Sequence, residues 1–185
     1  KVILKTYPHI KTILKKTKKY SGKFRTAKMK VIAGEKRKET THKENKVFMK
    51  LDIEKCYFSP RLSEERKRIS SLVKKGENVL VMFSGIGAYP LVISKNALAR
   101  KITGIEMNPI AHKYAEENVK LNKLNNIFLI KGDVKKIMPQ IKEKFDRIIM
   151  PLPKSSENFL YLIKNKAKRG TVIHLYQFER DNEPI

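Results

Sequence analysis

Residues 79–90, VLVMFSGIGAYP, limit the possible folds of this chain more than any other segment. An apolar run that ends at turn residues is typical of a strand buried on both faces of a sheet. Glycines in the loop that follows let backbone N–H groups come close to a ligand, because they have no Cβ. The segment therefore predicts a buried strand, a ligand-contacting loop and then a helix.

The alternation of strand and helix continues to the end of the chain and predicts an α/β fold. The predicted strands cover 79–83, 102–106, 127–131, 146–150 and 171–176, and the predicted helices lie near 88–99, 109–122, 134–141 and 155–167. Asn108-Pro109 indicates a helix start, and Gly170 after a basic segment indicates a helix end. Right-handed crossovers between such strands give a parallel, doubly wound, Rossmann-like sheet over residues 77–185. Because few residues follow Tyr176, a domain truncated at its C-terminal end stays an alternative.

The first part of the chain has a different pattern. KMKVIAG (28–34) and KVFMKLDI (46–53) alternate apolar and polar side chains, which predicts two strands. The charged segment between them, 35–45, is expected to be a turn. We predict a small, basic, mostly β domain over residues 1–58 and a connecting helix over residues 59–76.

The charge of the chain indicates a polyanionic partner. Lys and Arg outnumber Asp and Glu by 42 to 18, which gives a net charge of +24. Nucleic acid is the first such partner, because phosphate contacts dominate binding of this kind. The alternative is a lysine-rich surface of the sort found in thermophiles.

Composition argues against several other classes of protein. The single cysteine, Cys56, excludes an internal disulfide and a thiolate metal cluster. The histidines are scattered without ligand spacing, so no metal site is expected. No apolar stretch reaches the length of a membrane span and no signal peptide is visible. We expect a cytoplasmic protein without a membrane partner, acting as a monomer.

Ligands of an open parallel sheet bind beyond the carboxyl ends of the strands. The glycine loop follows the first strand, Glu106 follows the second about 20 residues further on, and Asp133 follows the third. Glu106 is placed to accept hydrogen bonds from ribose hydroxyls, and Asp133 to accept one from an adenine amino group. The predicted cofactor contacts are Phe83, Ser84, Gly85, Ile86, Gly87, Glu106, Met107, Asn108, Asp133, Val134 and Pro151.

The glycine pattern narrows the choice of ligand. It is G-x-G-x-Y and not the G-x-G-x-x-G of dinucleotide-binding domains, and no G-K-[ST] of a P-loop follows. The loop also carries no Lys or Arg for a pyrophosphate. A nucleoside ligand without phosphates, S-adenosylmethionine, fits best, and an ordinary strand-to-helix turn is the alternative.

A fourth segment, DRIIMPLPKSS (146–156), reaches the same edge of the sheet. Pro151 and Pro153 flank Leu152 directly after a predicted buried strand, which gives a rigid ledge with few backbone N–H groups. In a methyltransferase this edge faces the methyl acceptor, so the ledge is a candidate contact for a flat base. The alternative is a simple helix start with a serine cap.

Four ordered segments together resemble the archaeal and eukaryotic tRNA (guanine-37-N1) methyltransferase family. They are YFSPRLSEER (57–66), MFSGIGAYP (82–90), IEMNPIAHKYAEENVKLNKLNN (105–126) and IIMPLPKSSENFL (148–160), and the similarity extends over residues 22–176. The resemblance implies a class I methyltransferase domain that binds S-adenosylmethionine, preceded by a small domain with catalytic groups. It also implies tRNA as the partner and N1 of guanosine 37 as the methyl acceptor.

The resemblance further implies roles for three residues. N1 of guanine carries a proton, so its methylation needs a general base and stabilisation of charge on O6. The family's glutamate matches Glu65 and its arginine matches Arg25, whose guanidinium suits an enolate-like oxygen. Arg61 of the same motif can clamp a phosphate or pair with a carboxylate. Taken without the family, Glu65 is a solvated helix carboxylate close to Arg66.

Two other functions stay open from the sequence. One is the transfer of the aminocarboxypropyl group from the same cofactor in the wybutosine pathway, and the other is a non-catalytic RNA-binding module. The Glu65 and Arg25 pair and the Pro-Leu-Pro ledge favour methyl transfer. The ledge departs from the family, which often has Asn in place of Pro151, so base contacts there are expected from the backbone.

Overall fold

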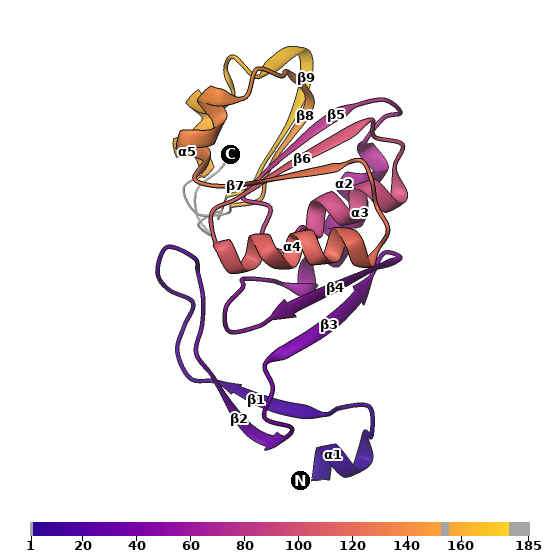
Figure 1. Cartoon of the computed structure of the whole chain (residues 1–185), viewed down its shortest axis with the longest axis vertical. Coiled ribbons are helices and arrows are strands. Elements are labelled where there is room, and N and C mark those ends of the chain that lie inside the picture. Colours follow the sequence, from indigo (N-terminus) through magenta and orange to yellow (C-terminus); the bar gives the residue numbers. More distant parts are fainter. Residues whose placement is uncertain (1, 153–155, 178–185) are drawn as a thin grey trace, which may run out of the picture.

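The computed structural model describes residues 2–152 and 156–177 and contains a five-stranded parallel sheet (Figure 1). The strands lie in the order β7-β6-β5-β8-β9, so the central strand β5 has β6 on one side and β8 on the other. Their bounds are Asn78–Met82 (β5), Lys101–Glu106 (β6), Ile127–Lys131 (β7), Phe145–Met150 (β8) and Ala167–Leu175 (β9). The predicted doubly wound α/β fold is confirmed, and its switch point lies between β5 and β8.

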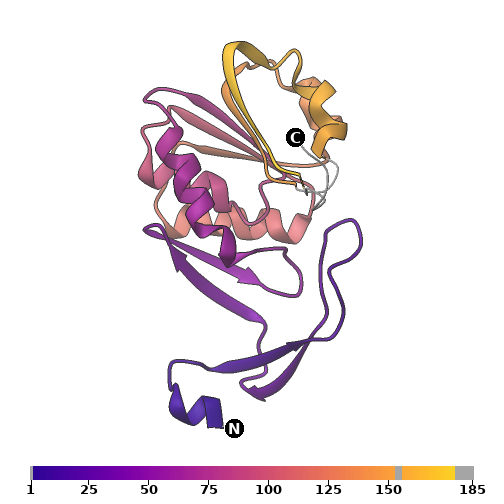
Figure 2. The ribbon, with the colours of Figure 1, turned by 180° about the vertical axis from the view of Figure 1, so that it is seen from behind.

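Helices cover both faces of the sheet (Figure 2). They are α2 (Ser63–Leu72), α3 (Ala88–Asn96), α4 (Pro109–Leu121) and α5 (Val134–Ile137), with 3-10 helices η1 (Pro60–Leu62), η2 (Met138–Gln140) and η3 (Ser156–Ile163). Side chains of β5 alternate between the two cores: Val79 and Val81 pack on the α2–α3 side, and Leu80 and Met82 pack on the α5–η2 side. All four are fully buried, and each contributes about 1.5–3 kcal/mol by the area removed from water.

Two antiparallel hairpins and a short helix precede this domain. They consist of α1 (Val2–Thr6), β1 (Thr12–Lys16) paired with β2 (Met29–Gly34), and β3 (Glu39–Glu44) paired with β4 (Val47–Asp52). The predicted strands at 28–34 and 46–53 are confirmed. The long β1–β2 loop extends toward the carboxyl edge of the sheet in both views (Figures 1 and 2).

The prediction of a turn at residues 35–45 is wrong, because residues 39–44 form β3. Its sequence, ETTHKE, is polar on both sides and only Glu44 is buried, so β3 lacks the hydrophobic alternation of a strand. The turn itself is Asn45-Lys46, with φ values of 43° and 66°. Two positive φ values suit a two-residue hairpin connection, which twists as the strands do.

The predicted helix at 155–167 is also wrong in part. The described portion is the 3-10 helix η3, and β9 begins at Ala167. Gly170 lies inside β9 with a φ of 86° and does not end a helix. A register shift between the pairings of Phe145 and Arg147 accompanies it, and Lys168 binds Asp146 at 2.7 Å. A bulged strand start rich in basic residues therefore imitates a basic helix terminus.

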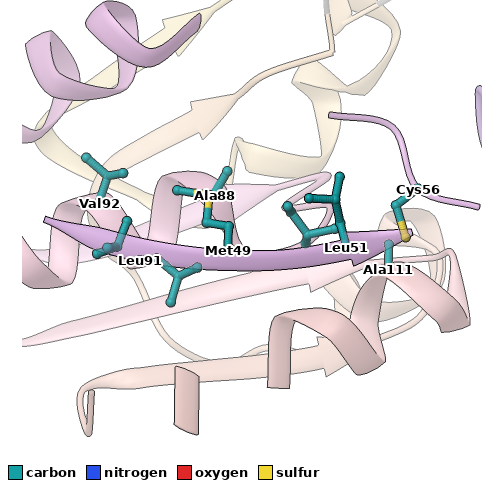
Figure 3. Packing of buried hydrophobic residues seen from close by; sticks show 9 residues of the cluster. Met49, Leu51, Cys56, Ala88, Leu91, Val92 and Ala111 are labelled. Atoms are coloured by element: carbon teal, nitrogen blue, oxygen red, sulfur yellow. The ribbon is translucent and has the colours of Figure 1, made fainter. Parts of the chain in front are cut away.

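Strand β4 packs directly on helices α3 and α4 (Figure 3). Met49 and Leu51 are buried against Leu91 and other apolar side chains of these helices. The fully buried Asn118 completes the contact: its side chain accepts from Lys50 N at 2.7 Å and donates to Lys50 O at 3.1 Å. The β3–β4 hairpin thus shares one core with the sheet domain, and the backbone edge of β4 is satisfied by a side chain.

Candidate active site

A cavity of about 390 Å³ opens at the carboxyl ends of β5, β6 and β8, next to the switch point of the sheet. This is where open α/β sheets bind their ligands, and its volume is in the range of small-ligand pockets. The β1–β2 loop and the segment before α2 close it from the other side. Lining residues from these parts include Lys23, Phe24, Arg25, Tyr57, Phe58, Ser59, Leu62 and Arg66.

The glycine loop is fixed by Glu106 at the end of β6. One carboxylate oxygen accepts from Gly85 N at 2.7 Å, and the other accepts from Asn108 N at 2.6 Å. Phe83 and Gly85 have positive φ values, 59° and 57°, which turn the chain sharply after β5. The predicted contacts Phe83, Ser84, Gly85, Ile86, Glu106, Met107 and Asn108 all line the cavity.

Gly87 is not among the described residues that line the cavity. It is the N-cap of α3 with a φ of 85°, and a Cβ there would lie 3.3 Å from the Cβ of Ala115. The structure thus places Gly87 at the α3–α4 contact, as a packing residue that lets the loop turn into the helix.

Burial raises the pKa of Glu106, and hydrogen bonds from the backbone of Asn108 and Gly85 oppose that rise. An ionised carboxylate offers about four acceptor sites, and these two N–H groups occupy two of them. The backbone N–H of Met107 also acts on this carboxylate, and the acceptor capacity that remains is available to a hydroxyl group in the cavity.

Asp133 and Val134 line the cavity after β7. Asp133 caps α5, because its side chain accepts from Lys135 N at 2.9 Å. Pro151 and Leu152 form part of the wall beyond β8, and Ser156 Oγ donates to the carbonyl of Leu152. The predicted ledge is therefore in place as far as Leu152, and Pro153 lies outside the described residues.

Two hydroxyl groups lie in the wall: that of Ser84, a predicted cofactor contact, and that of Tyr89, which the sequence-based prediction of contacts did not include. Ser84 Oγ and Tyr89 OH are buried and have no hydrogen-bond partner within residues 2–152 and 156–177. Unsatisfied buried hydroxyls in a cavity wall are unfavourable unless a ligand or water binds them. Tyr89 belongs to the G-x-G-x-Y pattern, but its place in the apolar first half of α3 is also that of a core residue.

Arg25 reaches the cavity from the β1–β2 loop with a φ of 49°. Its guanidinium lies over the ring of Tyr57, 5.0 Å from the ring centroid. A cation held on an aromatic face is oriented yet keeps its N–H donors free. Arg25 can therefore donate to an anionic or enolate-like oxygen in the cavity.

Glu65 and Arg61 are not among the described residues that line the cavity. Arg68 binds the carboxylate of Glu65 through two hydrogen bonds of 2.7 and 2.8 Å, and Tyr176 OH donates a third. The hydrogen bonds of Arg68 lower the pKa of Glu65, and burial partly opposes them. Glu65 directly precedes the lining residue Arg66 on α2.

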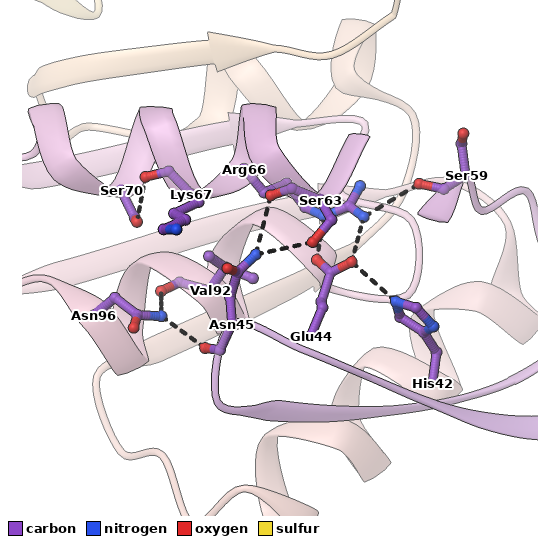
Figure 4. Close-up of polar contacts among 10 residues, drawn as sticks. All are labelled: His42, Glu44, Asn45, Ser59, Ser63, Arg66, Lys67, Ser70, Val92 and Asn96. Atoms are coloured by element: carbon purple, nitrogen blue, oxygen red, sulfur yellow. Dashed lines mark hydrogen bonds and ion pairs between the residues drawn. The ribbon is translucent and has the colours of Figure 1, made fainter. Parts of the chain in front are cut away.

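Arg66 connects the cavity wall to a buried ion pair (Figure 4). Its Nε and Nη2 donate to the two oxygens of Glu44 at 2.5 and 2.7 Å, and Nη2 also donates to Ser59 O at 3.1 Å. Burial raises the pKa of Glu44, but the hydrogen bonds and charge of Arg66 outweigh this effect and the pKa is lowered. The pair ties α2 to the β3–β4 hairpin.

No helix in the described part of the chain is long and apolar enough to cross a membrane.

Comparison with known proteins identifies relatives of the whole chain. Residues 40–185 match the model of the TRM5/TYW2 methyltransferase domain. The tRNA (guanine(37)-N(1))-methyltransferase Trm5b of Pyrococcus abyssi is 40% identical over 184 residues, covering 100% of this chain and 54% of that protein. A tRNA(Phe) (4-demethylwyosine(37)-C(7)) aminocarboxypropyltransferase of Methanocaldococcus jannaschii is 37% identical over 167 residues, covering 90% of this chain and 66% of that protein.

Solved structures agree with this grouping. The complex of aTrm5 and tRNALeu has a TM-score of 0.86 and 35% identity, covering 95% of this chain and 51% of that chain. The complex of M. jannaschii TYW2 with AdoMet has a TM-score of 0.68 and 35% identity, covering 76% of this chain and 63% of that chain. The chain spans about half the length of the curated Trm5b relative that it matches, 54%.

Proposed function

The chain belongs to the TRM5/TYW2 methyltransferase family, and from this membership we propose that it transfers a methyl group from S-adenosylmethionine to N1 of guanosine 37 in tRNA. One observation carries the proposal: the cavity combines the Gly85–Glu106 loop contact with the guanidinium of Arg25, held over the ring of Tyr57. The similar Trm5b and the tRNA-bound aTrm5 support the reaction and the partner. The net charge of +24 suits binding of a polyanion.

The cavity walls fit S-adenosylmethionine, which the similar TYW2 structure contains. The acceptor capacity that the backbone N–H groups leave on Glu106 suits the hydroxyls of a ribose. Asp133 lies where it can accept from an adenine amino group. The buried hydroxyl of Ser84, which has no hydrogen-bond partner among the described residues, is available to the polar end of the methionine moiety.

In the proposed reaction the cofactor supplies an electrophilic methyl group, and the protein prepares the acceptor nitrogen. The carboxylate of Glu65 takes the proton from N1 of guanine. Arg25 donates to O6, where negative charge develops as the proton leaves. Pro151 and Leu152 support the flat base beside the cofactor, with Arg61 as a proposed contact to the tRNA backbone.

Transfer of the aminocarboxypropyl group is the second candidate function. It is favoured by the 37% identity to the aminocarboxypropyltransferase of M. jannaschii, which covers 90% of this chain. That reaction uses the same cofactor and attacks a different carbon, so it requires another pose of the cofactor in the same cavity.

Incubation with labelled S-adenosylmethionine and tRNA transcripts that carry either G37 or A37 distinguishes these functions. We expect 1-methylguanosine from the G37 transcript alone, identified by mass analysis of the nucleosides. A mass gain of an aminocarboxypropyl group on a wybutosine precursor would establish the second function. Cofactor binding without any product would indicate the non-catalytic module.

Glu106→Gln is expected to weaken binding of S-adenosylmethionine about 10- to 100-fold. The amide replaces an acceptor oxygen with an N–H donor, which cannot accept from the N–H groups of Gly85 and Asn108 and from ribose at once. Hydrogen bonds to a charged group contribute about 1.5–3 kcal/mol, and each 1.4 kcal/mol is about tenfold in affinity. Calorimetric titration measures the change, with Glu117→Gln as the control, since Glu117 pairs with Lys50 of β4 at 3.7 Å and is not among the described residues that line the cavity. Equal affinity of Glu106→Gln and the unaltered chain would contradict the assignment.

The cytoplasmic location, the monomeric state and the division at residues 58 and 76 stay predictions. The shared core of β4 with α3 and α4 is consistent with a small unit that depends on the sheet domain for its stability.

A further inference from the structure

The Glu65 carboxylate is surrounded by donors from two distant parts of the chain. Arg68, on its own helix, occupies two acceptor sites with bonds of 2.7 and 2.8 Å. The hydroxyl of Tyr176, which follows β9, occupies a third. A carboxylate offers about four such sites, so about one remains for another donor.

Tyr176 links this carboxylate to the wall of the cavity. Its ring centroid lies 6.2 Å from that of Tyr89, and its side chain packs against the buried cluster that contains Tyr89 and Ile69. Tyr89 lines the cavity, and the phenols of Tyr89 and Tyr176 influence each other's pKa. Tyr176 therefore bonds to the Glu65 carboxylate through its hydroxyl while its ring packs next to a residue of the cavity wall.

We propose that Tyr176 is a positioning residue that orients the Glu65 carboxylate, so that its remaining acceptor site is presented to the N1–H group of the target base. The inference rests on the proposed role of Glu65 as the general base. The proton moves from N1 to a carboxylate oxygen of Glu65, the N1 lone pair then forms the bond to the methyl group, and Tyr176 keeps its own proton throughout.

The charged surroundings of Glu65 come from three elements. Arg68 contributes a full positive charge from α2, Tyr89 lies on α3, and His174 lies on β9. Burial lowers the pKa of His174, and so does the neighbouring Arg147, whose Nη1 lies 2.7 Å from His174 Nε2. Arg68 and the hydroxyl of Tyr176 stabilise the ionised Glu65, and the charge of His174 adds a smaller effect in the same direction.

The sign of the effect follows from these contacts. The hydrogen bonds of Arg68 lower the pKa of Glu65, burial raises it, and the hydrogen bond of Tyr176 lowers it further. Removing the hydroxyl takes away one donor to the charged form, so the pKa rises. The carboxylate then becomes protonated at a higher pH and loses its ability to act as a base there.

Tyr176→Phe tests the proposal, because it removes the hydroxyl and keeps the ring that packs near Tyr89. Tyr114→Phe is the matched control: its hydroxyl donates to Glu39 at 2.7 Å on the surface, so the same type of bond is removed elsewhere. A ¹³C NMR titration of the Glu65 side-chain carboxyl is measured on each whole chain. The pH profile of methyl transfer to the G37 transcript is measured in parallel.

We expect the Glu65 pKa and the acid limb of the rate profile to rise together by about one unit in Tyr176→Phe. Neither changes in Tyr114→Phe. An unchanged Glu65 pKa in Tyr176→Phe overturns the inference, and the titration needs no enzymatic activity to show it. If the acid limb of Tyr176→Phe is unshifted and Glu65→Gln is inactive, the positioning role of Tyr176 is overturned. The proposed role of Glu65 as the base then still stands. If Glu65→Gln keeps full activity, the proposed base is wrong and the inference falls with it.

Discussion

Glu44→Gln is expected to lower the free energy of unfolding by about 3–5 kcal/mol, because it leaves a buried arginine without its counter-charge. The side chains of Arg66 and Glu44 are only 2% and 3% exposed, so water cannot replace the lost partner. The two hydrogen bonds of 2.5 and 2.7 Å also join α2 to β3. The loss therefore affects the packing of the hairpin on the sheet domain as well as the charge.

Urea unfolding of three variants isolates the effect. Glu64→Gln, one position from Glu65 on the same helix, breaks an exposed pair with Lys67 at 3.8 Å whose side chains are 85% and 65% exposed. We expect it to change stability by less than about 1 kcal/mol. Combining Glu44→Gln with Arg66→Met removes the unpaired charge and is expected to recover part of the loss. A loss below about 1 kcal/mol in Glu44→Gln would show that Arg66 finds another partner.

The pH dependence of the same variant gives an independent check. The folded-state pKa of Glu44 is lowered from its ordinary value of 4.5, since Arg66 outweighs burial. The stabilisation is therefore fully present above that value and is lost as the pH falls through the lower folded-state pKa. The difference in stability between the unaltered chain and Glu44→Gln is expected to be constant near neutral pH and to shrink in acid.

The sequence predicts the sheet domain well because its three inner strands, β6, β5 and β8, are buried on both faces. The continuous apolar run of β5 and the spacing from Gly85 to Glu106 identify the central strand and the cavity edge without tertiary information. Strand β3 escaped prediction for the opposite reason. One face of it is exposed and the other is occupied by polar groups, so its only specific signal is the pairing with β4.

Some residues of the candidate site could likewise be predicted from the sequence, and others could not. Residues that bind through loop backbone or strand-end carboxylates follow from chain position, since the topology brings all strand ends to one edge. Groups that act through long-range contacts do not. Glu44 and Arg66 are 22 positions apart in the sequence, and Glu65 and Tyr176 are 111 positions apart. No local sequence pattern around these residues predicts either contact.

Glu65→Gln is expected to lower the rate of methyl transfer by about 10²- to 10⁴-fold, the typical contribution of a general base. The amide keeps the size of the side chain and can still accept from Tyr176 or Arg68, but it cannot take a proton at neutral pH. Binding of S-adenosylmethionine is expected to stay unchanged, because Glu65 is not among the described residues that line the cavity.

Single-turnover transfer to the G37 transcript measures the chemical step, and a calorimetric titration measures cofactor affinity. Glu64→Gln is the control, since Glu64 lies on the same helix as Glu65, carries the same carboxylate and has a side chain that is 85% exposed. A fall in rate of less than tenfold in Glu65→Gln would assign the proton to another acceptor. A large fall together with lost cofactor affinity would instead indicate that α2 had moved. Only a slow reaction at unchanged affinity supports a base that lies beside the cavity and meets the substrate when the tRNA base enters it.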